Sequence, residues 1–293
     1  MIIVRLLGGL GNQMFQFAAG YSLAKRLGVE VKLDTSYLLA HNLQGKNIVK
    51  RFFDLDIFDY QFDIASKLEV RRHVYWGKTN RINDFFHRII KKNNNVYLQP
   101  HTDYDKICEQ LQSPKYIIGY FQSYKYFINV VDEVRDIFTS FKQPLLDQGL
   151  SLKNEITELN SVCLNVRRTD FLKSAVHGVC SLKYYEKAVE HLSSIVGNIH
   201  IFVFADDIEW CKENLKFKYK TTFVDHSYAG QKFRDYFELM IACRHFIIPN
   251  SSFAWWAAWL GSDRDKIVVA PKKWYALEEY NTNDIYQSEW ILI

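Results

Sequence analysis

Two adjacent arginines at the end of a predicted strand are the residues whose type and spacing point most clearly to chemistry. The apolar run at 162–166 predicts a buried strand, and Arg167 and Arg168 follow it directly. Because side chains alternate between the faces of a strand, we expect one guanidinium to meet a ligand phosphate and the other to brace the site. The planar guanidinium fork suits phosphate oxygens. The commoner alternative is a surface arginine pair bound to Asp170.

Two further polar motifs follow predicted strands in the same half of the chain. Asp206 and Asp207 come after the apolar run at 202–204. Two carboxylates there could bind a divalent metal, cap the next helix or accept hydrogen bonds from a base. Asn250, Ser251 and Ser252 precede an apolar helix, so they form either an anion site at a helix N-terminus or an ordinary N-cap. The tryptophans of that helix are expected in the core, and the alternative is that one exposed indole face stacks on a sugar ring.

The N-terminal glycines form an incomplete dinucleotide-binding fingerprint. A short apolar strand leads into a glycine turn at 8–11, a helix follows, and Asp34 ends the next strand. The third glycine of the fingerprint, which allows a helix to pack closely on its strand, is Met14 here, and this disfavours a nicotinamide site. Asn12 and Gln13 are side-chain donors suited to sugar hydroxyls. Alternatively, the glycines only make the turn.

Apolar periodicity predicts that these motifs stand on alternating strands and helices. Strands are expected at 2–6, 29–33, 116–121, 162–166, 199–204, 222–224, 246–248 and 267–270, and helices at 14–27, 127–138, 183–196, 208–215, 233–243 and 253–260. This order is typical of a doubly wound α/β protein with parallel sheets. The length favours two lobes, residues 1–145 and 146–293, with a linker at 142–149. Ligands should bind in a central cleft that the lobes face, at the carboxyl ends of the strands.

Charge and cysteine content limit the partners and the location. The chain has 37 Lys and Arg against 33 Asp and Glu, and a net charge of +4 is too small to indicate nucleic acid. The cationic stretch from Lys67 to Lys92 is either a solvated face or a weak docking surface for an anionic membrane. Five widely spaced cysteines indicate neither disulfides nor zinc. We expect a cytoplasmic protein without export signal or anchor, which any membrane association would hold at the inner face.

Five motifs together carry a resemblance to a known family. They are Gly8-Gly9-Leu10-Gly11-Asn12-Gln13-Met14-Phe15-Gln16, Gly119-Tyr120-Phe121-Gln122-Ser123, Val166-Arg167-Arg168-Thr169-Asp170, Phe204-Ala205-Asp206-Asp207 and Asn250-Ser251-Ser252-Phe253-Ala254-Trp255-Trp256. Over nearly the whole chain they resemble glycosyltransferase family 11, the α-1,2-fucosyltransferases. The resemblance implies a GT-B fold of two Rossmann-like lobes and an inverting transfer of fucose from GDP-fucose to the 2-hydroxyl of a galactose. It also implies that no metal or other cofactor is needed.

The resemblance implies roles for individual residues. Arg167 would grip the donor diphosphate, and Asp207 would accept hydrogen bonds from the guanine edge. The expected catalytic residues are Arg167, Asp170 and His177, of which the last two are the candidate bases. The expected donor-binding residues are Asn165, Arg167, Arg168, Asp206, Asp207, Asn250, Ser251 and Ser252, and the expected acceptor or sugar contacts are Gly11, Asn12 and Gln13.

One departure from the family keeps an alternative open. Asn165 stands where the family usually has His, so it cannot serve as a titrating base. A non-catalytic carbohydrate- or nucleotide-binding relative of the same fold is therefore the alternative function. A nicotinamide oxidoreductase, which depends on the incomplete glycine motif, is a third.

Overall fold

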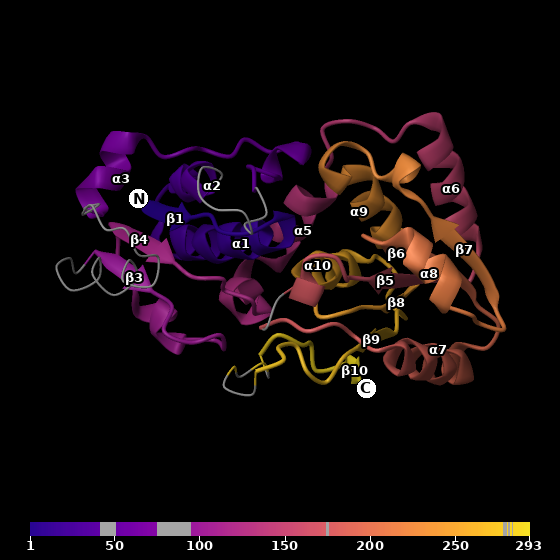
Figure 1. Ribbon diagram of the computed structural model, residues 1–293. Helices are drawn as coiled ribbons and strands as arrows, with labels where there is room; N and C mark the ends of the chain where they lie inside the picture. The colour runs from indigo at the N-terminus through magenta and orange to yellow at the C-terminus, as the bar shows by residue number, and fades with distance from the viewer. Residues whose placement is uncertain (42–50, 75–94, 174–175, 278–279, 281, 283) are drawn as a thin grey trace. The chain divides into compact units, whose positions relative to one another are not determined.

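The chain divides into two units, each built on its own parallel β-sheet. The computed structural model describes residues 1–41, 51–74, 95–173, 176–277, 280, 282 and 284–293 (Figure 1). Unit 1 consists of Met1–Ser140 with Asn283–Ile285, and unit 2 of Phe141–Thr282 with Tyr286–Ile293.

Unit 1 contains a four-stranded sheet in the order β2-β1-β4-β3, in which all neighbours are parallel. All four residues of its strand β1 are buried, as expected for an inner strand covered on both faces. The elements of the unit are β1 (Ile2–Arg5), α1 (Leu10–Leu27), β2 (Val31–Asp34), α2 (Ser36–His41), η1 (Leu55–Ile57), α3 (Lys67–His73), β3 (Val96–Leu98), η2 (Lys106–Gln110), β4 (Lys115–Ile118), η3 (Tyr124–Val130) and α5 (Val131–Thr139).

Helix α1 packs closely on β1 because a glycine faces the strand. A Cβ atom at Gly20 would stand only 2.1 Å from Cγ2 of Val4, so no other residue fits there without a shift. A dinucleotide-binding turn obtains such close packing from the third glycine of its fingerprint. In this protein Met14 occupies that position, and Gly20, further along the helix, allows the contact instead.

Unit 2 contains a six-stranded parallel sheet in the order β10-β9-β8-β5-β6-β7. This is the Rossmann order, in which the first strand of the unit, β5, lies between the second, β6, and the fourth, β8. The elements are α6 (Asp147–Glu158), β5 (Ser161–Val166), η4 (Phe171–Lys173), α7 (Leu182–Val196), β6 (His200–Ala205), α8 (Ile208–Asn214), β7 (Lys220–Val224), η5 (His226–Tyr228), η6 (Gln231–Phe233), α9 (Arg234–Ile241), β8 (His245–Ile247), α10 (Ser252–Leu260), β9 (Val268–Ala270) and β10 (Ile291–Leu292).

Helices cover both faces of this second sheet (Figure 1). Val162, Leu164 and Val166 of β5 belong to an apolar cluster that includes residues of α7 and α8. Side chains that alternate with these face the other layer, where the Phe204 ring of β6 lies 5.4 Å from the Tyr236 ring of α9. The two parallel sheets with their helices confirm the predicted α/β class with two Rossmann-like lobes.

One connection differs from the prediction. The sequence predicts a linker at 142–149, whereas α6 begins at Asp147 and places Gly149 inside the helix. Leu152 and Ile156 are buried on one face of α6, so packing of that face sustains a helix despite the glycine.

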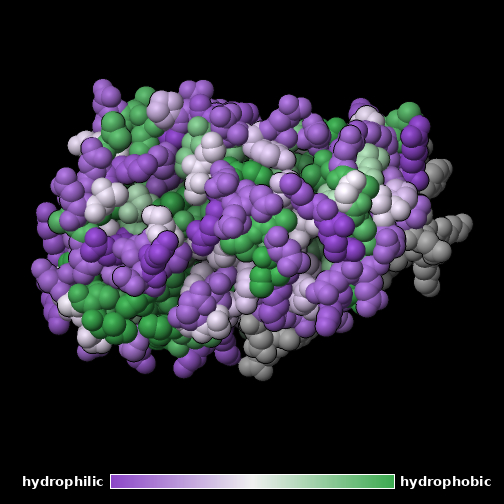
Figure 2. Space-filling view, turned by 180° about the vertical axis from the view of Figure 1, so that it is seen from behind, coloured by the Kyte–Doolittle hydropathy of each residue, from purple (hydrophilic) through white to green (hydrophobic). Residues whose placement is uncertain are grey.

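Hydrophilic side chains cover most of the face seen in Figure 2, and apolar residues gather between them in patches. Within the described parts of the chain, no helix is long and apolar enough to cross a membrane. Helix α3 opens the cationic stretch from Lys67 to Lys92, but residues 75–92 lie outside the described residues. Membrane docking through this stretch therefore stays a prediction.

Candidate functional site

The strand order of unit 2 marks the place where a ligand is expected to bind. Strands β5 and β8 are neighbours, although the chain continues from β5 to β6 and reaches β8 only after β7. At such a switch point the connections leave the two strands in opposite directions and open a crevice at their carboxyl ends. Residues 167–170 follow β5 here and residues 249–252 follow β8, so the sheet brings two of the predicted motifs to one place.

Arg167 is held between two carboxylates just beyond β5. Its Nη2 lies 2.8 Å from Oδ2 of Asp170, and its Nε lies 3.4 Å from Oδ2 of Asp206. The guanidinium carbon also stands 5.6 Å from the centre of the Phe171 ring. The Arg167 side chain remains 31% exposed. The guanidinium is thus fixed in place and still open to an anionic ligand.

Arg168 points to a different surface, as the alternation of a strand predicts. Its guanidinium carbon lies 3.6 Å from the centre of the Trp210 ring on α8, a cation–π contact. Its Nε is buried and has no hydrogen-bond partner within the described structure. This contact holds the Arg168 side chain against α8.

Asp206 organises that loop. Its Oδ1 accepts a hydrogen bond from the Arg168 N–H at 2.9 Å, and its Oδ2 accepts from the Thr169 N–H at 3.1 Å and the Thr169 hydroxyl at 2.6 Å. Together with the contact to Arg167, these bonds tie the end of β5 to the end of β6. Asp206 therefore positions the arginines.

Asp207 caps the next helix. Its Oδ1 accepts a hydrogen bond from the Trp210 N–H at 3.2 Å, which satisfies one of the open donors at the start of α8. Only one of its two carboxylate oxygens makes this bond. The other oxygen retains acceptor capacity toward a ligand at the carboxyl end of β6.

His177 approaches the same edge of the sheet through stacking and a backbone bond. Its ring stacks on Phe171 with centres 4.6 Å apart, and Asn250 Nδ2 donates a hydrogen bond to the His177 carbonyl at 2.7 Å. Asn250 also donates to the Trp274 carbonyl at 2.9 Å and is only 4% exposed. Phe171 therefore contacts both Arg167 and His177, and Asn250 anchors the histidine loop beside the end of β8.

A neutral thiol lies next to this anchor. The Sγ of Cys180 donates to Oδ1 of Asn250 at 3.8 Å. Burial raises the pKa of Cys180 to about 11, so the group stays protonated at neutral pH. It contributes a weak donor and no charge.

Ser251 and Ser252 stand at the N-terminus of α10. Ser251 is the N-cap residue, and its side chain makes no capping bond, while its carbonyl accepts from the Trp255 N–H at 2.9 Å. The first N–H groups of a helix lack partners within the helix and attract anions. Trp255, Trp256 and Trp259 are buried, which confirms the prediction that they belong to the core.

Residues 62–293 match a family model described as glycosyl transferase family 11, and this match spans most of the chain. The chain belongs to glycosyl transferase family 11. It is a glycosyltransferase, as the sequence motifs predict.

Three curated glycosyltransferases are similar to this chain. An alpha-1,2-colitosyltransferase of Escherichia coli is 31% identical, with 100% of this chain and 99% of the relative covered. The O-antigen biosynthesis glycosyltransferase WbnK of Escherichia coli is 32% identical, with 98% of both covered. A galactoside 2-alpha-L-fucosyltransferase of Caenorhabditis elegans is 21% identical, with 97% of this chain and 74% of the relative covered.

The side chain of Asn165 is buried and bonds to the neighbouring strand. It is 8% exposed, its Nδ2 donates to the Phe204 carbonyl at 3.0 Å, and it lies 4.0 Å from Sδ of Met240. The amide is thus committed to the contact between β5 and β6.

The predicted sugar contacts of unit 1 are only partly open. Gln13 is fully buried, and its amide bonds to the carbonyls of Gly8 and Phe52 and to the N–H of Asp54. Gly11 is buried within α1. Asn12 lies closer to the surface and accepts a hydrogen bond from Nε2 of Gln122 at 2.8 Å. Of the three, Asn12 alone is partly exposed.

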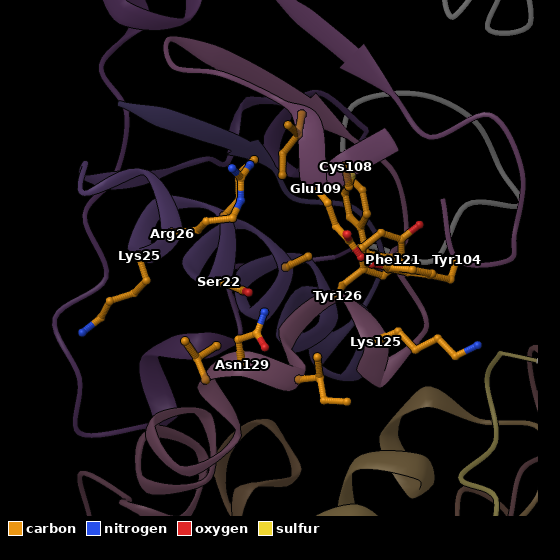
Figure 3. A pocket seen from close by; sticks show the side chains of 15 residues that line it. Ser22, Lys25, Arg26, Tyr104, Cys108, Glu109, Phe121, Lys125, Tyr126 and Asn129 are labelled. Atoms are coloured by element: carbon orange, nitrogen blue, oxygen red, sulfur yellow. Dashed lines mark hydrogen bonds between the residues drawn. The ribbon is translucent and has the colours of Figure 1, made fainter. Parts of the chain in front are cut away.

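Unit 1 also contains a cavity of about 350 Å³ between α1, η2 and η3. None of the predicted site residues is among the fifteen that line it (Figure 3). Figure 3 shows Lys25 extending away from the aromatic cluster around Tyr126, whereas Nζ of Lys125 lies 5.9 Å from the centre of the Tyr104 ring. The Tyr104 hydroxyl donates to Glu109, so polar groups of this wall bond to each other.

Three residues that contact the predicted site residues were not themselves predicted from the sequence. Thr169, Phe171 and Trp210 all contact Arg167, Arg168 or Asp206, yet single aromatic or hydroxyl side chains carry no pattern that marks such contacts. A cap by one of the two aspartates was among the alternatives that the sequence left open, whereas the stacking of Trp210 on Arg168 was not predicted. Within the described residues, no group of three or more His, Cys, Asp and Glu could hold a metal ion.

Proposed function

We propose that this family 11 member transfers L-fucose from GDP-fucose to the 2-hydroxyl of a terminal galactose, with inversion, during surface glycan synthesis. The observation that carries the proposal is the partly exposed Arg167, fixed between Asp170 and Asp206 at the switch point of unit 2. A fixed guanidinium at this point suits the diphosphate of a nucleotide sugar. The names of the curated relatives, which include a galactoside fucosyltransferase and an O-antigen enzyme, support the sugar and the pathway class.

Unit 2 is the donor side of this proposal. Arg167 binds the diphosphate, while Ser251, Ser252 and the N–H groups of α10 add donors to its oxygens. Asp207 accepts from the guanine N1–H and N2–H₂ groups with the oxygen that does not cap α8. Asp206 and Asn250 act through the loops that they hold.

Leaving-group stabilisation is the main catalytic effect. When the bond between fucose and GDP breaks, negative charge develops on the diphosphate, and Arg167 is already in position to stabilise it. The diphosphate replaces Asp170 as the partner of Arg167, which leaves the Asp170 carboxylate able to accept the proton of the attacking hydroxyl. His177, whose ring stacks on Phe171, is the second candidate base.

The two candidate bases can be separated by their pH dependence. If Asp170 is the base, Asp170→Asn abolishes transfer, while His177→Gln keeps the acidic limb of the pH–rate profile of kcat. If His177 is the base, His177→Gln removes the limb near the ordinary histidine pKa of about 6.5. The Asn and Gln substitutions keep size and polarity, so a change in the limb reports proton transfer and not packing.

The transfer is proposed to need no metal, because Arg167 supplies positive charge at the donor phosphates. Enzyme treated with EDTA should therefore keep its full rate. A loss of rate that Mg²⁺ or Mn²⁺ restores would overturn this part of the proposal.

The activity itself is tested with purified protein, GDP-fucose and a β-galactoside. We expect GDP release that depends on the galactoside, and an NMR spectrum of the product with fucose α-linked to O2 of galactose. GDP binding without any transfer would instead favour the non-catalytic alternative.

Colitosyl transfer is a second candidate, favoured by the 31% identity to a colitosyltransferase over the whole chain. Colitose lacks the 3-hydroxyl of fucose, and a site that hydrogen-bonds a hydroxyl disfavours an analogue without it by about 10⁴-fold. Comparison of kcat/KM for GDP-fucose and GDP-colitose decides between the donors. A higher value for GDP-colitose would replace fucose in the proposal.

A further inference from the structure

The second switch point of the protein lies in unit 1, and two amide side chains meet there. In the order β2-β1-β4-β3, the chain leaves β1 toward β2 and returns to the other side of β1 with β4. The carboxyl ends of β1 and β4 are therefore a second expected binding crevice. Asn12 follows β1 and Gln122 follows β4, and Gln122 Nε2 donates to Asn12 Oδ1 at 2.8 Å.

The turn after β4 has an unfavourable backbone conformation that the fold maintains. Phe121 has φ of 51°, in the left-handed region that bulky residues rarely adopt. Its ring is fully buried, 5.2 Å from the ring of Tyr126 and 6.4 Å from that of Tyr97. Such conformations persist where the surroundings fix them, and they occur often at binding sites.

The side chain of Gln99 holds the same turn through two hydrogen bonds. Its Oε1 accepts hydrogen bonds from the N–H groups of Tyr120 at 3.0 Å and Phe121 at 2.9 Å. A Cβ atom at Gly119 would stand 2.6 Å from that oxygen, so a glycine is needed for the approach. These contacts fix the backbone of the turn from Gly119 to Gln122, and with it the directions in which its side chains point.

Tyr120 is the residue that this turn presents to solvent. Its side chain is 47% exposed, while Phe121 beside it is fully buried and Gln122 is 7% exposed. The result is an aromatic ring at the carboxyl edge of the sheet, in the same short turn as an amide pair. An aromatic face with adjacent amides suits a pyranose, which has both C–H groups and hydroxyls to contact.

We propose that Tyr120 is the stacking platform for the acceptor galactose and that Asn12, whose amide Gln122 holds in place, hydrogen-bonds one of its hydroxyls. The axial 4-hydroxyl of galactose leaves C3–H, C4–H and C5–H on one face of the ring, and the negative face of an aromatic ring attracts such C–H groups. The bond from Gln122 to Asn12 Oδ1 leaves Nδ2 of Asn12 as the donor end toward a sugar oxygen. This inference rests on the proposed function and adds the residues that select the acceptor.

Steady-state kinetics with methyl β-D-galactoside and GDP-fucose test the platform. Tyr120→Ala should raise KM for the galactoside about tenfold and leave both KM for GDP-fucose and the affinity for GDP unchanged. Tyr120→Phe keeps the ring and should behave nearly as the parent. Leu68→Ala, on the 63% exposed Leu68 of α3, is the control for loss of an exposed apolar side chain in unit 1 and should change neither KM.

The 4-epimer provides a readout that a loss of folding would not give. The parent should prefer the galactoside to methyl β-D-glucoside, and Tyr120→Ala should reduce this preference because the C–H face no longer has a partner. An unchanged galactoside KM in Tyr120→Ala, or an equal loss toward both epimers, would overturn the proposal.

Binding measurements separate this proposal from the proposed function. Ligand-observed NMR detects galactoside binding to the protein loaded with GDP, without any turnover. Binding that is about tenfold weaker in Tyr120→Ala supports the platform even if no fucose is transferred, in which case the proposed function alone fails. Normal transfer with unaltered binding in Tyr120→Ala refutes the platform alone.

Discussion

Nη2 of Arg167 lies 2.8 Å from Oδ2 of Asp170, three residues further along the chain. Both side chains are partly exposed, at 31% and 21%. An ion pair in contact with water contributes about 0–1 kcal/mol, so a diphosphate can displace Asp170 from Arg167 at little cost. The ion pair with Asp170 keeps the Arg167 guanidinium in place before the donor binds. It is weak enough for the diphosphate to replace Asp170 when the donor arrives.

Replacement of Arg167 should therefore affect activity far more than stability. We expect Arg167→Ala to lower kcat by about 10²- to 10³-fold, because charge on the leaving diphosphate is no longer stabilised. The melting temperature should change little, since the lost ion pair is weak. Arg167→Lys retains the charge without the planar fork, so its kcat should lie between those of the parent and Arg167→Ala. Near-normal turnover of Arg167→Ala would contradict the assignment.

Asp206 should behave differently, because it holds the loop and not the ligand. Asp206→Ala removes the acceptors of three hydrogen bonds from Arg168 and Thr169. We expect the free energy of unfolding to fall by about 2–3 kcal/mol in urea titrations, together with a loss of activity. Asp206→Asn, which retains one carbonyl acceptor, should be milder in both. A variant with full stability and no activity would indicate that Asp206 contacts the donor directly.

The guanine role of Asp207 can be separated from its capping role. Asp207→Ala loses the bond to the Trp210 N–H, which should cost about 1 kcal/mol of stability. Serine also caps helices, so Asp207→Ser should recover the stability but not the acceptor for the base. We expect both variants to bind GDP more weakly by calorimetry. Parent-like GDP affinity in Asp207→Ser would reject the guanine contact.

The stability of unit 2 should fall at acid pH through a buried histidine. His245 is 4% exposed, its Nδ1 accepts from the Ile267 N–H at 3.1 Å, and its Nε2 lies 3.1 Å from Oδ1 of Asn160. Both bonds fit the neutral ring, and burial lowers the pKa of His245. Below the unfolded pKa of about 6.5, the unfolded chain binds a proton that the folded chain resists, so stability is lost as pH falls.

Thermal melting at different pH values tests whether stability falls with pH as predicted. The melting temperature should drop between about pH 7.5 and about pH 5.5, and the drop should be smaller in His245→Gln, which has no group that titrates there. Equal slopes for the two proteins would show that His245 does not contribute. Burial also lowers the pKa of His200. His200 is present in both proteins, so its effect on the melting temperature cancels in the comparison.

Local patterns determined which residues form elements and where the motifs stand on them. The apolar run before Arg167 became β5, and the run before Asp206 became β6, because burial of both faces gives a strand its continuous apolar sequence. The helix α6 escaped this reasoning. The helix depends on the packing of Leu152 and Ile156. Pro144 and Gly149 are typical of a linker, so the sequence predicted no helix at Asp147.

Only the tertiary structure decided which motifs meet and which side chains remain open. The sequence places Arg167 and Asn250 far apart, and the pairing of β5 with β8 brings their loops to one edge, because strand order depends on long-range contacts. Alternation predicted that Arg167 and Arg168 diverge, but not that Asp206 would hold their loop. Likewise, the amides of Gln13 and Asn165 had suitable chemistry for ligands, and buried hydrogen bonds commit them to the fold instead.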